Sequence, residues 1–200
     1  MHHLSIVLKH VVPKVVREFL VPSDVRLDRL HDVIQIVMGW TDSHMHEFVV
    51  GGLREGLRYG PAGHELGIFG DGPADERKAT LQQIAAAKGA KFLYCYDFGD
   101  DWLHEVAVKA IIKPIEATTA PVCLKATGAC PPEDCGGPWG YAGLLEVLRD
   151  PKHEDHNEMR EWVGEEWNPE LYDIDEVNAA LAGLARRWKR TSKKTGTTRT

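Results

Sequence analysis

The stretch that decides the fold is LSIVLKHVVPKVVREFLVPSDVRLDRLHDVIQIVMG, residues 4–39. Residues 4–12 and 15–21 carry the apolar patterns of two strands, and Pro13 separates them, which predicts a hairpin. Apolar residues then recur at helical spacing, as Leu27, Leu30, Ile34 and Val37. Gly39 is a natural C-terminal cap for this helix. The order strand, strand, helix predicts a β-grasp-like opening, with the helix laid across a sheet.

Further along the chain, the same patterns predict an α+β fold built on a mixed sheet. A strand is expected over 44–49, with His44 and His46 on one face. A glycine-rich loop with short strand fragments follows over 51–73, and a short helix over 80–87 is expected to end at Gly89. The remaining expected elements are strands 91–96 and 102–112 with the turn 97–101, a cysteine- and proline-rich loop 118–138, and helices 141–148, 153–163 and 173–188.

Length and charge predict one domain with a basic end. Two hundred residues can bury a real core without disulfides, and we expect a single domain over 1–188 followed by a basic, disordered tail over 189–200. The net charge of −6 hides an asymmetry, since residues 186–200 hold seven of the 24 basic residues and no acid. The other 17 basic residues face 30 acids, so the body of the protein repels phosphate while the tail attracts it.

The sequence favours a cytoplasmic protein. No apolar run approaches the roughly 20 residues that span a bilayer, which argues against a membrane partner, and the N-terminus lacks a signal-peptide pattern. In the cytoplasm the four cysteines are expected to be reduced or bound to a metal.

Two stretches concentrate groups that a plain structural loop does not need. The first is YCYDFGDDWLHE, residues 94–105, and the second is residues 123–141 with the core ACPPEDCGG at 129–137. Together they carry aromatic, acidic, thiol and imidazole side chains. We predict that these two stretches converge into one site.

The motifs in these stretches resemble those of a known family. GWTDSH at 39–44, the Tyr94–His104 pattern YxYDFGDxWxH and ACPPEDCGG at 129–137 with Gly140-Tyr141 are similar to the plasmid pRiA4b ORF-3-like family. The resemblance covers roughly residues 4–185. One departure is VVRE at 15–18, where the family usually has Ile-Trp-Arg-Arg. The resemblance implies an α+β fold and no established activity, although some members carry labels such as resolvase or transposon passenger.

The cysteines predict a zinc site. Three thiolates and one imidazole form a common closed tetrahedral centre, and the candidate ligands are Cys123, Cys130, Cys135 and His153. The spacing is not C-x2-C, so the tight zinc-knuckle turn is missing. The alternatives are three reduced thiols that lend apolar bulk to a loop, and a nucleophilic cysteine.

A second group predicts a ligand site. Carboxylates close to one another can bind a divalent cation or act as acid and base, and an aromatic, imidazole-lined cleft can bind a small ligand or a peptide. The alternatives are turn chemistry for the aspartates and core packing for the aromatic rings. The candidate residues are Trp40, His44, His46, Asp97, Asp100, Trp102, His104, Glu133 and Asp134.

These observations favour a non-catalytic binding or accessory protein, with zinc or another ligand in the site and a small molecule or a protein as partner. No catalytic residue is assigned. A rival hypothesis is a metal-dependent hydrolase that uses Asp97, Asp100, Glu133 and His104 around a divalent ion. A third is a mobile-element accessory that touches nucleic acid through residues 186–199 alone. Recombinase catalysis is rejected, because none of the four serines lies in the basic active site that a serine resolvase needs, and the last tyrosine, Tyr172, has an acidic setting.

Overall fold

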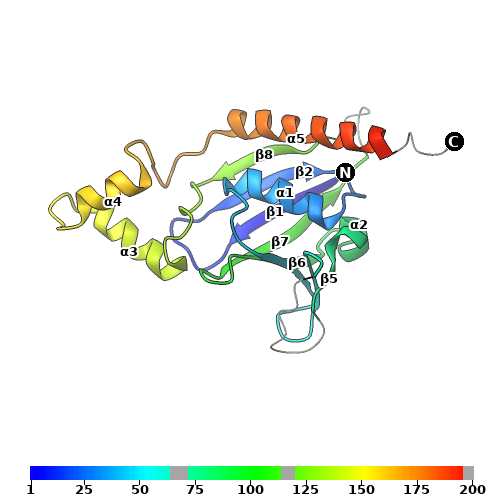
Figure 1. Cartoon of the computed structure of the whole chain (residues 1–200), viewed down its shortest axis with the longest axis horizontal. Coiled ribbons are helices and arrows are strands. Elements are labelled where there is room, and N and C mark those ends of the chain that lie inside the picture. Colours follow the sequence, from blue (N-terminus) through cyan, green and yellow to red (C-terminus); the bar gives the residue numbers. More distant parts are fainter. Residues whose placement is uncertain (64–71, 114–119, 196–200) are drawn as a thin grey trace.

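A computed structural model describes residues 1–63, 72–113 and 120–195 of the chain and shows one eight-stranded sheet with helices against it (Figure 1). The strand order is β5-β4-β3-β6-β7-β1-β2-β8, and all neighbours are antiparallel except β4 and β5. The strands are β1 His2–Leu8, β2 Val16–Val21, β3 His46–Val50, β4 Leu57–Gly60, β5 Ala74–Asp75, β6 Lys91–Tyr96, β7 Trp102–Ile111 and β8 Val122–Thr127. The helices are α1 Leu27–Met38, α2 Leu81–Ile84, α3 Gly137–Arg149, α4 His156–Val163 and α5 Ile174–Thr195, with a 3-10 turn η1 at Glu76–Lys78. The predicted α+β class and mixed sheet are confirmed.

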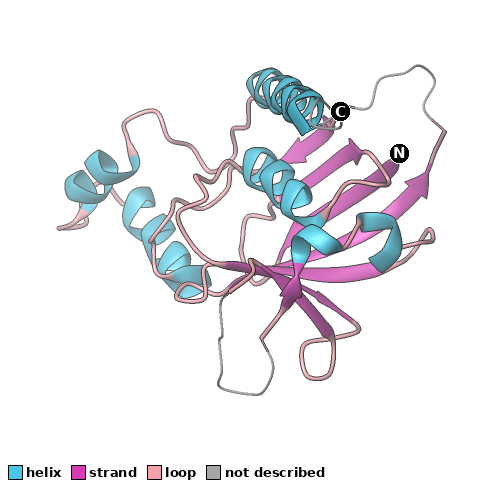
Figure 2. Cartoon of the chain, turned by 45° about the vertical axis from the view of Figure 1, so that its right-hand side comes forward, coloured by secondary structure: helices cyan, strands magenta, loops and turns pink. Residues whose placement is uncertain are grey.

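The hairpin and helix predicted from residues 4–39 form, although the first strand ends at Leu8 rather than at residue 12. Strands β1 and β2 pair antiparallel, and α1 packs with α2 and α5 on one face of the sheet (Figure 2). The four predicted inward residues of α1 are fully buried: Leu27, Leu30, Ile34 and Val37. Gly39 ends the helix in the left-handed region, with φ 97°, and its N–H donates to the Gln35 carbonyl. Amphipathic spacing therefore placed both the helix and its end correctly.

Strands β6 and β7 also agree with the sequence prediction, and they bring the turn 97–101 to the edge of the helical layer. Every second residue at the start of β7 is buried, beginning with Trp102 and His104, both at 0% exposure. The sheet presents this face to α1 because the alternation of apolar and polar residues allows only one face to be buried.

Four local predictions were wrong. The expected loop 118–138 contains the strand β8. This strand forms by pairing with β2, and the local sequence does not show that pairing. His44 lies before β3, since the chain turns at Asp42 with φ 58° before it becomes extended. His153 lies in a turn before α4. Helix α2 is shorter than 80–87, and Gly89 lies in a separate turn.

The C-terminal helix is longer than the sequence predicts. Helix α5 continues to Thr195, beyond the expected end at residue 188, so the first part of the segment 189–200 is helical. Residues 196–200, and residues 64–71 of the predicted loop 51–73, lie outside the described residues. The domain division at residue 188 stays a prediction. No described helix is long and apolar enough to cross a membrane.

Candidate functional site

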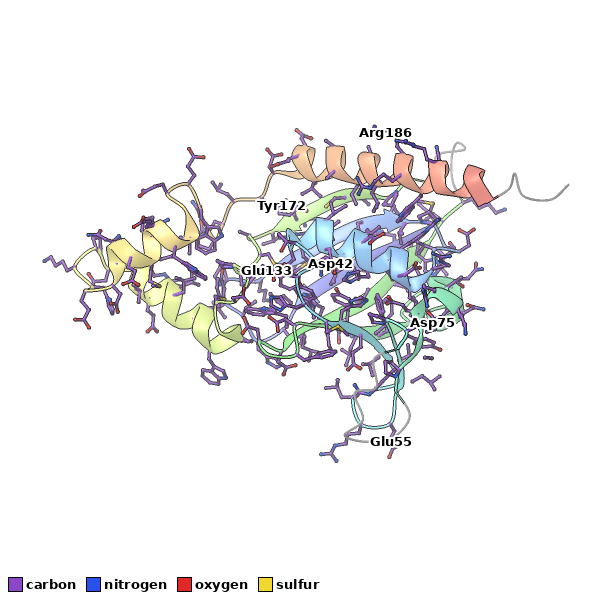
Figure 3. All side chains as sticks on the ribbon, in the orientation of Figure 1. Asp42, Glu55, Asp75, Glu133, Tyr172 and Arg186 are labelled. Carbon is purple, nitrogen blue, oxygen red and sulfur yellow. The ribbon has the colours of Figure 1, made fainter. Side chains whose placement is uncertain are left out.

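Three segments that are far apart in the sequence meet beside the N-terminal end of α3. They are the loop 40–45 after α1, the turn 97–101 between β6 and β7, and the segment 128–136 after β8. Glu133 lies where this last segment meets the body of the sheet (Figure 3). The predicted convergence of the stretches 94–105 and 123–141 is confirmed, since the Gly136 N–H donates to Asp100 Oδ2 at 3.1 Å and the Tyr96 hydroxyl donates to Glu133 Oε1 at 3.2 Å.

The turn 97–101 is built by one oxygen of Asp97. Asp97 Oδ1 accepts hydrogen bonds from the N–H groups of Gly99, at 2.9 Å, and Asp100, at 3.3 Å. This is the hydrogen bonding of an Asx turn. Asp97 itself has φ 54° and is 6% exposed. The turn therefore uses one carboxylate oxygen and leaves the other, Oδ2, directed at the imidazole of His44, 3.6 Å away.

The loop 40–45 is held from three sides. The backbone N–H of Thr41 donates to Glu133 Oε1 at 2.9 Å, and that of Ser43 donates to the Tyr96 hydroxyl at 3.0 Å. From α1, Gln35 Oε1 accepts the N–H of Asp42 at 2.9 Å. The loop is thus tied to α1, β6 and the segment before α3, and these ties fix the position of His44.

His44 lies at the centre of the site. Its Nε2 atom lies 3.6 Å from Asp97 Oδ2, 3.5 Å from Glu133 Oε2 and 3.1 Å from Asp134 Oδ1. Nε2 is buried, yet none of these contacts has hydrogen-bond geometry. The exposed fraction of the side chain rises from 9% at Asp97 through 20% at Glu133 to 72% at Asp134. We call these four residues the His44 cluster.

Tyr96 and Asp100 support the cluster. Burial raises the pKa of Tyr96, so its hydroxyl stays protonated at neutral pH. This hydroxyl donates to both oxygens of Glu133, at 3.2 Å and 3.3 Å. Asp100 fastens the turn to Gly136, as described above. Gly137 makes this approach possible, because its φ is 68° and a Cβ there would lie 2.4 Å from the Asp100 carbonyl oxygen.

Three predicted ligand-site residues lie in the core. Trp40 is 7% exposed, stacks on Tyr96 with ring centroids 4.7 Å apart and donates from Nε1 to the Pro131 carbonyl at 3.2 Å. Trp102 and His104 are fully buried. Burial lowers the pKa of His104 to about 4, and its Nδ1 lies 3.0 Å from the Tyr94 carbonyl oxygen. The ligand set expected for a hydrolase is therefore only half assembled, with His104 inside the core and Asp100 bound to Gly136.

His46 belongs to a separate, buried histidine pair that the sequence analysis missed. The rings of His31 and His46 stack, with centroids 3.5 Å apart and an angle of 6°. His31 Nε2 lies 2.8 Å from Asp42 Oδ1, His31 Nδ1 lies 2.8 Å from the Tyr94 hydroxyl, and His46 Nε2 lies 2.8 Å from Glu76 Oε2. Burial, followed by the neighbouring His46, lowers the pKa of His31 to about 4.

This pair orders the start of the loop rather than forming an open site. Three of the four ring nitrogens of the pair have a hydrogen-bond partner, and Gln35 completes the network by donating to the Tyr94 hydroxyl at 3.0 Å. A signal was available in the sequence, because His31 and Gln35 fall on the same helical face as Leu27 and Ile34.

The predicted zinc ligands do not come together. Among the described residues, no three of Cys123, Cys130, Cys135 and His153 place ligand atoms within 4.8 Å of one another. Cys123 is buried on β8, and its Sγ lies 3.7 Å from the Tyr172 hydroxyl. His153 is exposed, and its Nδ1 accepts the Asp155 N–H at 3.1 Å. Cys123 belongs to the unexpected strand β8, and Cys130 and Cys135 belong to the segment after it.

Burial also disfavours the thiolate form of all four cysteines. Burial raises the pKa of Cys95 and of Cys135 to about 12, and it raises the pKa of Cys123 and of Cys130 as well. The thiolate is the nucleophilic and metal-binding form, so it is scarce at neutral pH. These groups match the packing alternative rather than a nucleophile.

Two hypotheses about the protein remain predictions. Binding of nucleic acid through residues 186–199 is untested, and so is the choice of metal. The described geometry places imidazole and carboxylate groups together, and a set of this kind can hold a divalent cation.

Comparisons with known proteins give the family. The sequence profile of the plasmid pRiA4b ORF-3-like protein matches residues 1–176. An uncharacterised protein, y4hQ of Sinorhizobium fredii, is 42% identical over 193 residues, which cover 96% of this chain and 95% of that protein. The crystal structure of MM3350, a protein of unknown function from Methanosarcina mazei, matches with a TM-score of 0.76 and 35% identity, over 88% of this chain and 96% of that one. The chain therefore belongs to the plasmid pRiA4b ORF-3-like family.

Proposed function

We propose that this protein binds a divalent metal ion through the His44 cluster, as a non-catalytic binding protein. The observation that carries the proposal is the position of His44 Nε2, a buried nitrogen without a hydrogen bond that faces three carboxylate oxygens at 3.1–3.6 Å. Ligand atoms that share a metal at about 2.1 Å lie about 3.0–3.4 Å from one another, in octahedral and tetrahedral centres alike. The spacing around Nε2 is close to that of a ligand set.

The ligand chemistry favours a transition-metal ion. Imidazole nitrogen suits zinc, and carboxylate oxygen suits manganese, magnesium and calcium. A mixed set of one imidazole nitrogen and two carboxylates, from His44, Asp97 and Asp134, supports zinc or manganese over magnesium, which dehydrates reluctantly and prefers oxygen ligands. The expected ion is thus still zinc or a similar metal, held by ligands other than the cysteines.

The surroundings of the cluster also support a metal centre. Ligating groups in metal sites are oriented by further hydrogen bonds. Here Glu133 accepts from Tyr96 and from the Thr41 backbone, while Asp97 Oδ1 is occupied by the turn. A bound ion would join the loop 40–45, the turn 97–101 and the segment before α3. The proposed role of the ion is therefore to fasten the segment before α3 to the turn that joins the central strands β6 and β7.

The test is calorimetric titration of the protein, purified without a histidine tag and stripped with chelator, with Zn²⁺ and with Mn²⁺. We expect one ion per chain. The variants His44→Gln and Asp97→Asn should weaken binding by roughly a hundredfold or more, and Tyr96→Phe by about tenfold, since outer partners typically contribute roughly 10–100-fold.

The matched control is His153→Gln, the same substitution at the exposed histidine that the sequence analysis predicted as a zinc ligand together with the cysteines. It should leave binding unchanged. Binding that persists in His44→Gln but disappears in Cys130→Ser would restore the thiol site and refute the proposal. The absence of binding by either ion would refute it equally.

A further inference from the structure

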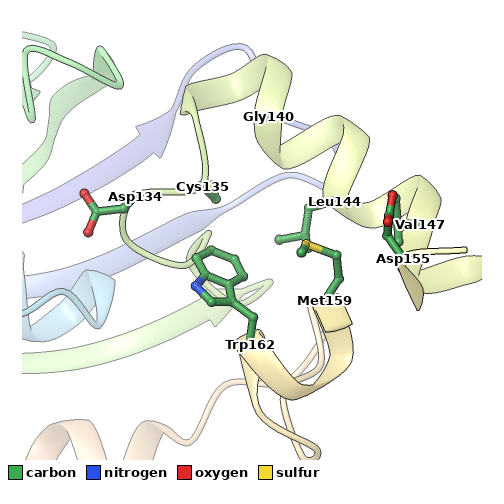
Figure 4. A pocket seen from close by; sticks show the side chains of 8 residues that line it. All are labelled: Asp134, Cys135, Gly140, Leu144, Val147, Asp155, Met159 and Trp162. Carbon is green, nitrogen blue, oxygen red and sulfur yellow. The ribbon is translucent and has the colours of Figure 1, made fainter. Parts of the chain in front are cut away.

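A cavity lies between α3 and α4, on the other side of the segment that carries Asp134. Its volume is ≈ 410 Å³, within the range of small-molecule pockets. It is lined by Asp134, Cys135, Gly140, Leu144, Val147, Asp155, Met159 and Trp162 (Figure 4). In this view the Asp134 carboxylate points away from Trp162, so the cavity and the His44 cluster share a backbone segment without sharing a carboxylate.

The middle of the cavity is apolar and aromatic. Leu144 from α3 and Met159 and Trp162 from α4 lie next to one another between the two aspartates (Figure 4). Met159, Trp162 and Val163 follow the i, i+3, i+4 spacing of one helical face. Yet α4 has no buried residue, and Trp162 is 48% exposed. The apolar face of α4 is thus incompletely covered by the protein itself.

The charge of the cavity favours one kind of end group on a ligand whose ring is apolar. Its lining includes the carboxylate of Asp155, at the end opposite Asp134, and none of the eight lining residues is a lysine or arginine. A carboxylate or phosphate ligand would meet the negative charge of Asp155 here, although His153 Nδ1 lies 3.8 Å from Asp155 Oδ2. An ammonium group is attracted both to Asp155 and to the face of an indole ring such as that of Trp162.

We propose that this cavity binds a small aromatic amine. Its ring lies against Leu144, Met159 and Trp162, and its ammonium group pairs with Asp155. The inference goes beyond the proposed metal site and does not depend on it, because Asp155 takes no part in the His44 cluster. The same cavity is expected to bind the amine with or without a divalent ion.

The experiment compares three probes that share an indole ring and differ in the end group: tryptamine, which is cationic, tryptophol, which is neutral, and 3-indolepropionate, which is anionic. Binding is measured by calorimetry in the presence of chelator, so that its result is separate from that of the metal titration. Tryptamine should bind at least tenfold more tightly than 3-indolepropionate, with tryptophol between them.

Two variants locate the site. Asp155→Asn keeps the shape and should reduce the affinity for tryptamine several-fold while leaving that for tryptophol unchanged. Met159→Trp fills the cavity and should abolish binding of all three probes. Trp139→Ala is the control, since Trp139 is 90% exposed on α3 and does not line the cavity, and it should bind as the wild type does.

Three outcomes overturn the proposal. They are no binding of any probe to the wild type, equal affinity for the amine and the carboxylate, and tryptamine affinity that is unchanged in Asp155→Asn. Circular dichroism checks that Met159→Trp is folded. Should that variant not fold, Asp155→Asn still decides, because the Asp155 side chain is 54% exposed and makes no capping hydrogen bond to α4.

Discussion

Acid should destabilise this protein through His104, and one substitution isolates the effect. His104 is fully buried on β7, its Nε2 has no hydrogen-bond partner, and its Nδ1 lies 3.0 Å from the Tyr94 carbonyl oxygen. This geometry suits the neutral imidazole with the proton on Nδ1 and leaves no acceptor for a second proton. The perturbation is a change of pH from 7 to 4, applied to the wild type and to His104→Gln, whose amide can still donate to Tyr94.

The magnitude follows from the lowered pKa. Burial lowers the pKa of His104 from 6.5 to about 4. Between these values the unfolded chain takes up a proton that the folded chain excludes, so the free energy of unfolding falls as the pH falls. The contribution is fully present above pH 6.5 and is lost by about pH 4. At about 1.4 kcal/mol per pH unit, the loss amounts to about 3 kcal/mol.

The assay is urea unfolding followed by circular dichroism at several pH values between 7 and 4, with chelator present so that no metal contributes. The pH dependence of the wild type should exceed that of His104→Gln by about 3 kcal/mol over this range. Any constant loss of stability caused by the substitution cancels, because only the two pH dependences are compared. Parallel curves for the two proteins would refute the argument.

Three more predictions test other parts of the structure. Gly137→Ala should cost about 1–2 kcal/mol from its positive φ alone, with the contact to the Asp100 carbonyl adding to this. Gly143→Ala on the same helix should instead gain up to about 1 kcal/mol, because a Cβ there meets nothing within 4 Å; equal melting temperatures of the two variants would contradict this pair of expectations. All four thiols should react slowly with a disulfide reagent at pH 8 in the native protein and fast in urea, since burial raises their pKa values; fast native labelling would show an exposed thiolate. Any affinity for duplex DNA should fall steeply with salt and vanish when residues 189–200 are deleted, and binding that survives the deletion would place the contact elsewhere.

The spatial grouping of the residues around His44 was predicted in part, and that part has a physical reason. Asp97, Glu133 and Asp134 lie in two stretches whose acidic and glycine residues have little use in a core, so their sequence context already marks them as turns. The alternating apolar and polar residues of β6 and β7 predicted a hairpin, and Asp97 is the first residue of the turn between its two strands. His44, at the centre of the cluster, is among the predicted candidates, but the sequence pairs it with His46 on one face of a strand. That pairing is wrong, because β3 begins only at His46 and His44 lies in the loop before it.

The wrong part concerns pairing between distant segments. Cys123 was assigned to a loop because residues 122–127 are short and lie between prolines, and only the partner strand β2 shows that they form the edge strand β8. The histidine pair was missed for the same reason, since His31 and His46 lie on different elements and meet only when α1 packs on the sheet.

The sequence by itself determined the elements with a strong local period: the hairpin and helix of residues 4–39, the strands β6 and β7, and the family. These helices and strands can be predicted because the spacing of apolar residues along a short stretch of sequence shows which face of the element is buried. Only the tertiary structure decided which polar groups share a site. His44, Asp97, Glu133 and Asp134 come together on three loops whose apolar residues show no regular spacing. The hydrogen bonds that hold these loops join residues up to 92 positions apart.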